Sequence, residues 1–76
     1  MTIAYVLIKS DLGAEQKVIE QLEKLEQVIR IDRTFGDYDM VLKLESEHIE
    51  KIRETIGRNI KKLDKVRSTL TLVERE

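Results

Sequence analysis

The residues best suited to bind a small polar molecule lie in the segment Gly36-Asp37-Tyr38-Asp39. Glycine permits a tight turn there, and backbone N–H groups exposed at such a turn can hold a carboxylate. The carboxylate of Asp39 can pair with an ammonium group. Together these groups match the two opposite charges of a free α-amino acid. The competing interpretation, which the residues alone favour, is a hairpin whose aspartates only satisfy their own backbone.

A second polar pair lies near the end of the chain. Thr69 and Thr71 are two positions apart in a segment with strand character, so their side chains project to the same face. A hydroxyl both donates and accepts hydrogen bonds, which suits contacts with either charged end of an amino acid. Thr69 and Thr71 therefore join Gly36 and Asp39 as candidate ligand residues.

The chain offers few groups for catalysis or for metal binding. It has no cysteine and a single histidine, His48. Without cysteine there is no thiol nucleophile and no thiolate metal site. The residues one helical turn after His48 are Lys51 and Ile52, which cannot join it in an acid–base pair or a metal site. We expect no catalytic residue, no metal and no cofactor.

Direct binding to nucleic acid is also not expected. The chain has a formal net charge of -1 and only 4% aromatic residues. RNA-recognition sheets stack bases on aromatic side chains, and no strand here is rich in them. A basic run does follow the second predicted helix, and we interpret it as the solvated cationic end of that helix. Its members are Arg58, Lys61, Lys62, Lys65 and Arg67.

The strands and helices that must position these residues alternate along the chain. Residues 3–8 are apolar on both parities and predict a central strand. Apolar residues at helical spacing predict a helix over 14–27. The alternating pattern of 28–35 predicts a half-exposed strand, joined by a two-residue turn at Gly36-Asp37 to a returning strand over 38–44.

The second half repeats this order. Ser46 is the predicted N-cap of a helix whose isoleucines at 49, 52, 56 and 60 form a core stripe. Gly57 within it either allows close packing or marks an early end of the helix. The last strand is expected over 66–73.

The order β-α-β-β-α-β predicts an α+β fold of the ferredoxin-like type, with a four-stranded antiparallel sheet and two helices on one face. We expect residues 1–76 to form a single domain. The uncovered face is predicted to carry one parity of the first strand together with Val41, Thr69, Thr71 and Val73. Such a face is too apolar to remain in water, and a chain of 76 residues has a marginal core, so we expect a second copy to cover it.

Other features bear on where the protein works. No apolar run of 18 residues exists, so no membrane span is expected, and the chain begins with a strand pattern rather than a signal peptide. A cytoplasmic location is therefore expected. The abundance of Glu, Lys, Arg and Ile is typical of many thermophile chains and leaves a thermophilic origin open.

The whole pattern resembles the effector domain of leucine-responsive (Lrp/AsnC) regulators, also called the RAM domain. The resemblance rests on Ala4-Tyr5-Val6-Leu7-Ile8, Gly13, Val18, Leu22, Gly36-Asp37-Tyr38-Asp39, Val66 and Thr69-Leu70-Thr71. The family often has glycine before the valine of the last strand, where this chain has Lys65. A slightly different turn is expected there.

The resemblance implies a homodimer paired through sheet faces, assembly into rings, and an amino-acid effector bound between dimers. Carried over, Gly36 and Tyr38 would shape the pocket, Asp39 would meet the ligand ammonium, and Thr69 and Thr71 would contact its polar atoms. Full-length members carry a helix-turn-helix domain before this module, so the chain is expected to be a stand-alone effector domain that modulates full-length regulators without binding DNA itself.

Two alternatives remain open. The chain could act only in oligomerisation or co-assembly, with an empty site. It could also be a small enzyme of the dimeric α+β barrel type, which would need polar catalytic groups inside the barrel, where this sheet offers mainly threonine hydroxyls.

Overall fold

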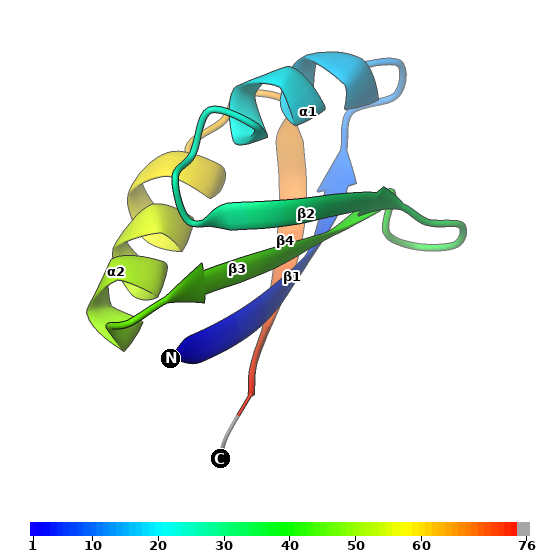
Figure 1. Ribbon diagram of the computed structural model, residues 1–76. Helices are drawn as coiled ribbons and strands as arrows, with labels where there is room; N and C mark the ends of the chain where they lie inside the picture. The colour runs from blue at the N-terminus through cyan, green and yellow to red at the C-terminus, as the bar shows by residue number, and fades with distance from the viewer. Residues whose placement is uncertain (75–76) are drawn as a thin grey trace.

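Four strands and the intervening helices follow one another in the predicted order along residues 1–74, which the computed structural model describes (Figure 1). The elements are β1 (Thr2–Ser10), α1 (Glu15–Leu22), β2 (Val28–Arg33), β3 (Met40–Ser46), α2 (Ile49–Glu54), η1 (Thr55–Ile60) and β4 (Val66–Val73). The strands form one sheet in the order β2-β3-β1-β4, and all three pairings are antiparallel. The ferredoxin-like βαββαβ fold is confirmed, with β1 and β3 central.

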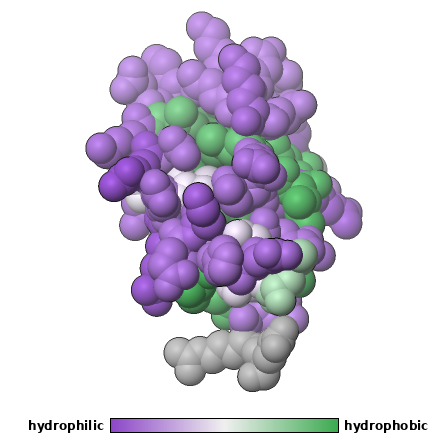
Figure 2. Space-filling model, turned by 60° about the vertical axis from the view of Figure 1, so that its left-hand side comes forward, coloured by the Kyte–Doolittle hydropathy of each residue, from purple (hydrophilic) through white to green (hydrophobic). Residues whose placement is uncertain are grey.

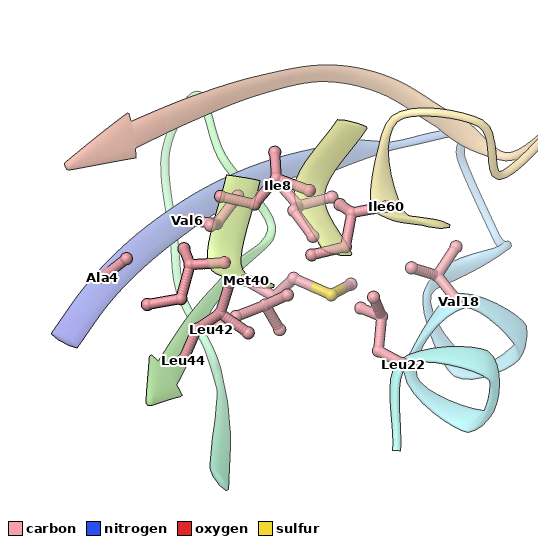
Figure 3. Packing of buried hydrophobic residues seen from close by; sticks show 11 residues of the cluster. Ala4, Val6, Ile8, Val18, Leu22, Met40, Leu42, Leu44 and Ile60 are labelled. Atoms are coloured by element: carbon pink, nitrogen blue, oxygen red, sulfur yellow. The ribbon is translucent and has the colours of Figure 1, made fainter. Parts of the chain in front are cut away.

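The core lies between the helices and one face of the two central strands. Alternate residues of β1 and β3 are fully buried because successive side chains of a strand point to opposite faces. They meet the apolar stripes of the helices, as Figure 3 shows. Each fully buried aliphatic side chain contributes about 1.5–3 kcal/mol relative to an exposed one. The fully buried core side chains are Ala4, Val6, Ile8, Val18, Leu22, Met40, Leu42, Leu44, Ile52 and Ile60.

The first helix is shorter than the pattern predicts. It spans Glu15–Leu22, and successive tight turns then carry the chain into β2, with the N–H of Leu25 bonded to the carbonyl of Leu22. Leu25 still packs against the core, so its place in the apolar stripe reflects burial without helical structure.

The second helical segment begins later than predicted. Ser46 is the last residue of β3, and His48 takes the N-cap position of α2. Ser46 Oγ accepts the N–H of His48 at 3.3 Å, so it satisfies a turn rather than the helix start.

From Thr55 the helix widens into a π-helical turn, η1, in which the N–H of Lys61 bonds to the carbonyl of Ile56 five residues back. Gly57 lies in this turn, and a Cβ atom added there would meet nothing within 4 Å. Neither reason offered for this glycine holds, because no close packing requires it and the helix continues to Ile60.

The connection between β2 and β3 is a six-residue loop, 34–39, rather than the predicted two-residue turn. The N–H of Asp39 donates to the carbonyl of Ile8 on β1, so Asp39 cannot join β3 in regular pairing with β2. Phe35 leaves the strand and is fully exposed. Figure 1 shows this loop projecting from the end of the sheet where β1 finishes.

The uncovered face of the sheet also differs from the prediction. Thr69, Thr71 and Val73 pair with Ile8, Val6 and Ala4, which point to the helices. Directly opposed residues of antiparallel strands project to the same face, so these three lie on the helix side. Leu70 and Leu72 pair with Leu7 and Tyr5 and lie on the uncovered face instead. Either set of alternate residues in β4 is compatible with the helix side of the sheet, so only the register of β4 with β1 decides which set lies there.

Candidate functional site

Asp39 is held at the end of β1 by two hydrogen bonds from one residue. The N–H of Ser10 donates to Asp39 Oδ2 at 2.7 Å, and Ser10 Oγ donates to the same oxygen at 3.0 Å. Ser10 is buried, with 5% of its surface exposed, while Asp39 is only partly buried. Hydrogen bonds to a charged acceptor are stronger than neutral ones, so the two bonds from Ser10 fix the position of the carboxylate. A ligand ammonium would therefore have to approach Oδ1 or share Oδ2.

The loop that precedes Asp39 is ordered by its own hydrogen bonds. The N–H of Thr34 donates to the carbonyl of Asp39 at 2.9 Å, and Thr34 Oγ1 donates to the carbonyl of Tyr38 at 2.7 Å. Gly36 lies at the exposed tip with φ +105°, a conformation that favours glycine. Because the N–H of Asp39 is already bonded to Ile8, it is not free to hold a ligand carboxylate in this arrangement.

A hollow of about 260 Å³ opens beside this loop. Asp39 is the only one of the five candidate ligand residues that lines it. Its lining includes one guanidinium, two carboxylates and an exposed aromatic ring, so groups of both charges are available to a zwitterion. The lining residues are Glu15, Arg33, Thr34, Phe35 and Asp39. The Nη2 atom of Arg33 donates to Gln16 Oε1 at 3.0 Å. The sequence pattern did not single out Glu15, Arg33 or Phe35, because a helix start and a strand end meet here only in the folded chain.

The threonines lie on the other side of β1. β4 and β3 flank β1 on opposite edges, so Thr69 and Thr71 are separated from Asp39 by that strand. Thr69 lines a different hollow, of about 210 Å³, which also contains Lys61 and Arg67. Within residues 1–74 of one protomer, β1 therefore lies between Asp39 and the two threonines.

Part of the predicted basic run is paired within the chain. Arg58 contacts Glu54 at 3.2 Å, and Arg67 contacts Asp11 at 3.6 Å. Both pairs are largely exposed and stabilise the fold by at most about 1 kcal/mol each. Their local partners favour the interpretation of this run as a solvated surface, and Figure 2 shows hydrophilic side chains covering most of one face of the molecule.

No group of three or more His, Cys, Asp or Glu side chains within residues 1–74 is arranged to hold a metal ion. Within the same residues, no helix is both long and apolar enough to cross a membrane.

A model of the Lrp/AsnC ligand binding domain matches residues 3–74. The chain belongs to the Lrp/AsnC ligand-binding domain family. This family is regulatory and non-enzymatic. The effector-domain resemblance carried by the loop and the last strand is thereby confirmed.

Curated relatives of this Lrp/AsnC domain are longer proteins. The HTH-type transcriptional regulator FL11 of Pyrococcus furiosus is 28% identical over 71 residues, which cover 93% of this chain and 46% of that protein. The regulatory protein AsnC of Haemophilus influenzae is 31% identical over 68 residues, which cover 90% of this chain and 45% of that protein. The chain thus spans less than half the length of these two relatives.

Solved structures share the fold closely. FFRP-DM1 superposes with a TM-score of 0.94 at 25% identity, covering 99% of this chain and 100% of that chain. The Thermus thermophilus protein TTHA0845 gives 0.93 at 28% identity, with 100% and 95% covered. Escherichia coli AsnC has the same fold, with a TM-score of 0.90 at 21% identity over 99% of this chain and 51% of that chain. The fold thus matches nearly the whole of the first two solved chains and about half of the third.

Proposed function

We propose that this Lrp/AsnC domain is a cytoplasmic effector-binding and oligomerisation module that senses a free amino acid and modulates full-length regulators of its family. The observation that carries the proposal is the carboxylate of Asp39, fixed by Ser10 at the edge of a hollow that also contains Arg33. Asp39 and Arg33 offer opposite charges to the ammonium and the carboxylate of one ligand. One relative is an HTH-type transcriptional regulator and another is a regulatory protein, which supports the choice of partner.

The remaining candidate residues fit this proposal when two protomers contribute. Gly36 and Tyr38 shape the loop, and Asp39 meets the ammonium group. Thr69 and Thr71 lie across β1 in the same chain, so we propose that they contact the polar atoms of a ligand held by the loop of another copy. Side-chain specificity would then be set across that interface.

The uncovered sheet face supports a homodimer as the first step of assembly. Its apolar residues come from three adjacent strands, and Leu70 and Leu72 of the edge strand are 46% and 54% exposed. A contiguous apolar patch of this kind marks an interaction site. A second copy would bury the same residues on both sides of a twofold axis, and further contacts would extend the dimer to a ring. The apolar residues on this face are Ile3, Tyr5, Leu7, Val41, Leu70 and Leu72, and Lys43 lies opposite Tyr5 on the same face.

Calorimetric titration of the assembled protein with each of the twenty amino acids tests the sensing function. We expect binding of at least one, with Asp39→Asn weakening it at least tenfold. Asp37→Asn is the matched control because Asp37 lies in the same loop, is exposed, and should leave binding unchanged. Failure of every amino acid to bind the oligomer would refute the proposal.

A purely structural role is the second candidate. The contact between Ser10 and Asp39 favours a structural role, because the Oδ2 atom of Asp39 already accepts two hydrogen bonds from Ser10. In that case Asp39→Ala would lower stability or change the assembly, and no amino acid would bind the wild-type protein.

A further inference from the structure

Arg33 is the last residue of β2, and its side chain reaches the start of α1. It lies directly opposite Met40, which is fully buried on the helix side of the sheet. Directly opposed residues of antiparallel strands project to the same face, so the side chain of Arg33 lies on the helix side too. There its Nη2 atom donates a hydrogen bond to Gln16 Oε1 at 3.0 Å. Both residues are exposed, so the bond contributes modestly to stability and mainly sets the position of the guanidinium.

The group that holds Arg33 carries no charge. Three other arginines, Arg30, Arg58 and Arg67, each contact a carboxylate, at 2.7, 3.2 and 3.6 Å. Within residues 1–74, Arg33 forms no such ion pair. A carboxylate would offset the positive charge of the guanidinium, whereas the amide oxygen of Gln16 accepts a hydrogen bond and leaves that charge in place. Arg33 is therefore held in position and still attracts an anion.

The guanidinium shares its hollow with the carboxylate of Asp39. Asp39 directly precedes Met40, the residue opposite Arg33, so the two charged residues come from adjoining positions of the paired segments. Asp39 is held by Ser10 in the same way that Arg33 is held by Gln16, through hydrogen bonds from or to an uncharged residue. Two opposite charges that are both held by neutral groups remain available to the carboxylate and the ammonium of one molecule.

We propose that Gln16 is a positioning residue, which keeps the guanidinium of Arg33 charged and in place to bind the α-carboxylate of an amino acid. The planar N–H groups of arginine match the two oxygens of a carboxylate. The site then selects amino acids over amines whose carboxylate is missing or uncharged. This inference rests on the proposed function and deepens it, because it names a residue outside the lining of the hollow that sets the charge within it.

Glu15 shows why the position of the guanidinium matters. It precedes Gln16 in the chain and lines the same hollow as Arg33. Without the bond to Gln16, the guanidinium would be free to pair with this carboxylate, and its charge would be lost to a ligand. A negative charge at position 16 would offset the guanidinium more directly. Because the first turn of a helix favours acidic residues, Gln16→Glu introduces that charge without weakening α1.

The test compares each of the twenty L-amino acids with its α-carboxamide, which keeps the ammonium and the side chain but lacks the negative charge. Calorimetric titration of the assembled protein gives both affinities. For every amino acid that binds, Gln16→Glu should lower its affinity about tenfold, because the charged contact with Arg33 is offset. The affinity for the matching carboxamide should stay the same or rise, since the added carboxylate attracts its ammonium. Gln21→Glu, at an exposed position of the same helix, is the matched control and should change neither affinity.

A second measurement separates action through Arg33 from a merely structural role. Once Arg33→Gln has removed the charge, adding Gln16→Glu should cause little further loss of amino-acid affinity. An equal loss for amino acid and carboxamide in Gln16→Glu, an unchanged amino-acid affinity, or a full further loss in the double variant would each overturn the role of Gln16 and leave the proposed function standing. If no amino acid binds the wild-type protein, the proposed function fails and the role of Gln16 fails with it.

Discussion

Two hydrogen bonds from Ser10 to Asp39 join the end of β1 to the loop 34–39, so removing one or both of them should lower the free energy of unfolding by different amounts. Asp39→Ala removes both acceptor contacts and leaves the N–H and hydroxyl of buried Ser10 without that partner. A buried donor without a partner costs about 1–3 kcal/mol. Because Asp39 is partly exposed and water can reach the site, we expect the free energy of unfolding to fall by about 2–3 kcal/mol.

Ser10→Ala should cost less. It removes only the 3.0 Å hydroxyl contact and leaves the 2.7 Å bond from the backbone N–H in place. A loss of about 1 kcal/mol is expected. Asp39→Asn keeps an oxygen that can accept the N–H of Ser10 and should fall between the two.

Urea denaturation at one fixed protomer concentration measures these differences, since oligomerisation makes stability depend on concentration. The double variant Ser10→Ala/Asp39→Ala should lose about 1 kcal/mol less than the sum of the single losses, because the two residues share one contact. For a domain of this size, 1 kcal/mol corresponds to about 4–8 °C in Tm. Strict additivity, or a greater loss in Ser10→Ala than in Asp39→Ala, would refute the reasoning.

Four further substitutions concern other elements. Gly57→Ala should raise the free energy of unfolding by about 0.5–1 kcal/mol, because the added Cβ meets open space. Gly36→Ala should lower the free energy of unfolding by about 1–2 kcal/mol although its surroundings are equally open, because φ at this position is +105°. Differential scanning calorimetry measures both glycine variants, and a change of the same sign in the two would contradict the argument. Thr55→Val should cost about 1 kcal/mol in urea denaturation by removing the 2.9 Å bond from Thr55 Oγ1 to Gln27 Oε1, whereas an unchanged midpoint would show that this bond adds nothing. Leu70→Asp should weaken the sheet-face dimer at least tenfold in sedimentation velocity, and Glu50→Arg on α2 is the control that should not.

Much of the fold follows from periodicity in the sequence. The double apolar parity of β1 correctly predicted a central strand, because a strand buried on both faces needs apolar residues at every position. Element ends were less accurate. Leu25 continues the helical stripe in sequence but packs from a turn, and Ser46 is typical of a helix start but completes β3. The spacing of apolar residues predicts which side chains are buried more reliably than it predicts the backbone conformation at those residues.

The candidate site was predicted in its residue types more than in its arrangement. Asp39 was singled out for its charge and its place after a glycine turn, yet its contact with Ser10 lies 29 positions away along the chain. Arg33 and Glu15 carried no local signal and reach the same hollow from different elements. Such long-range neighbours depend on how the strands pair.

The sequence by itself determined the order of elements, the apolar stripes that form the core and the absence of cysteine, because each depends on local composition or spacing. The tertiary structure alone decided which face the residues of β4 occupy. Register with β1 turned Thr69 and Thr71 toward the helices and left Leu70 and Leu72 uncovered. It also placed β1 between Asp39 and the threonines, so that these parts of the candidate site are separated in one chain. The physical reason is that strand register is set by pairing between distant segments, and a shift of one residue moves every side chain to the opposite face.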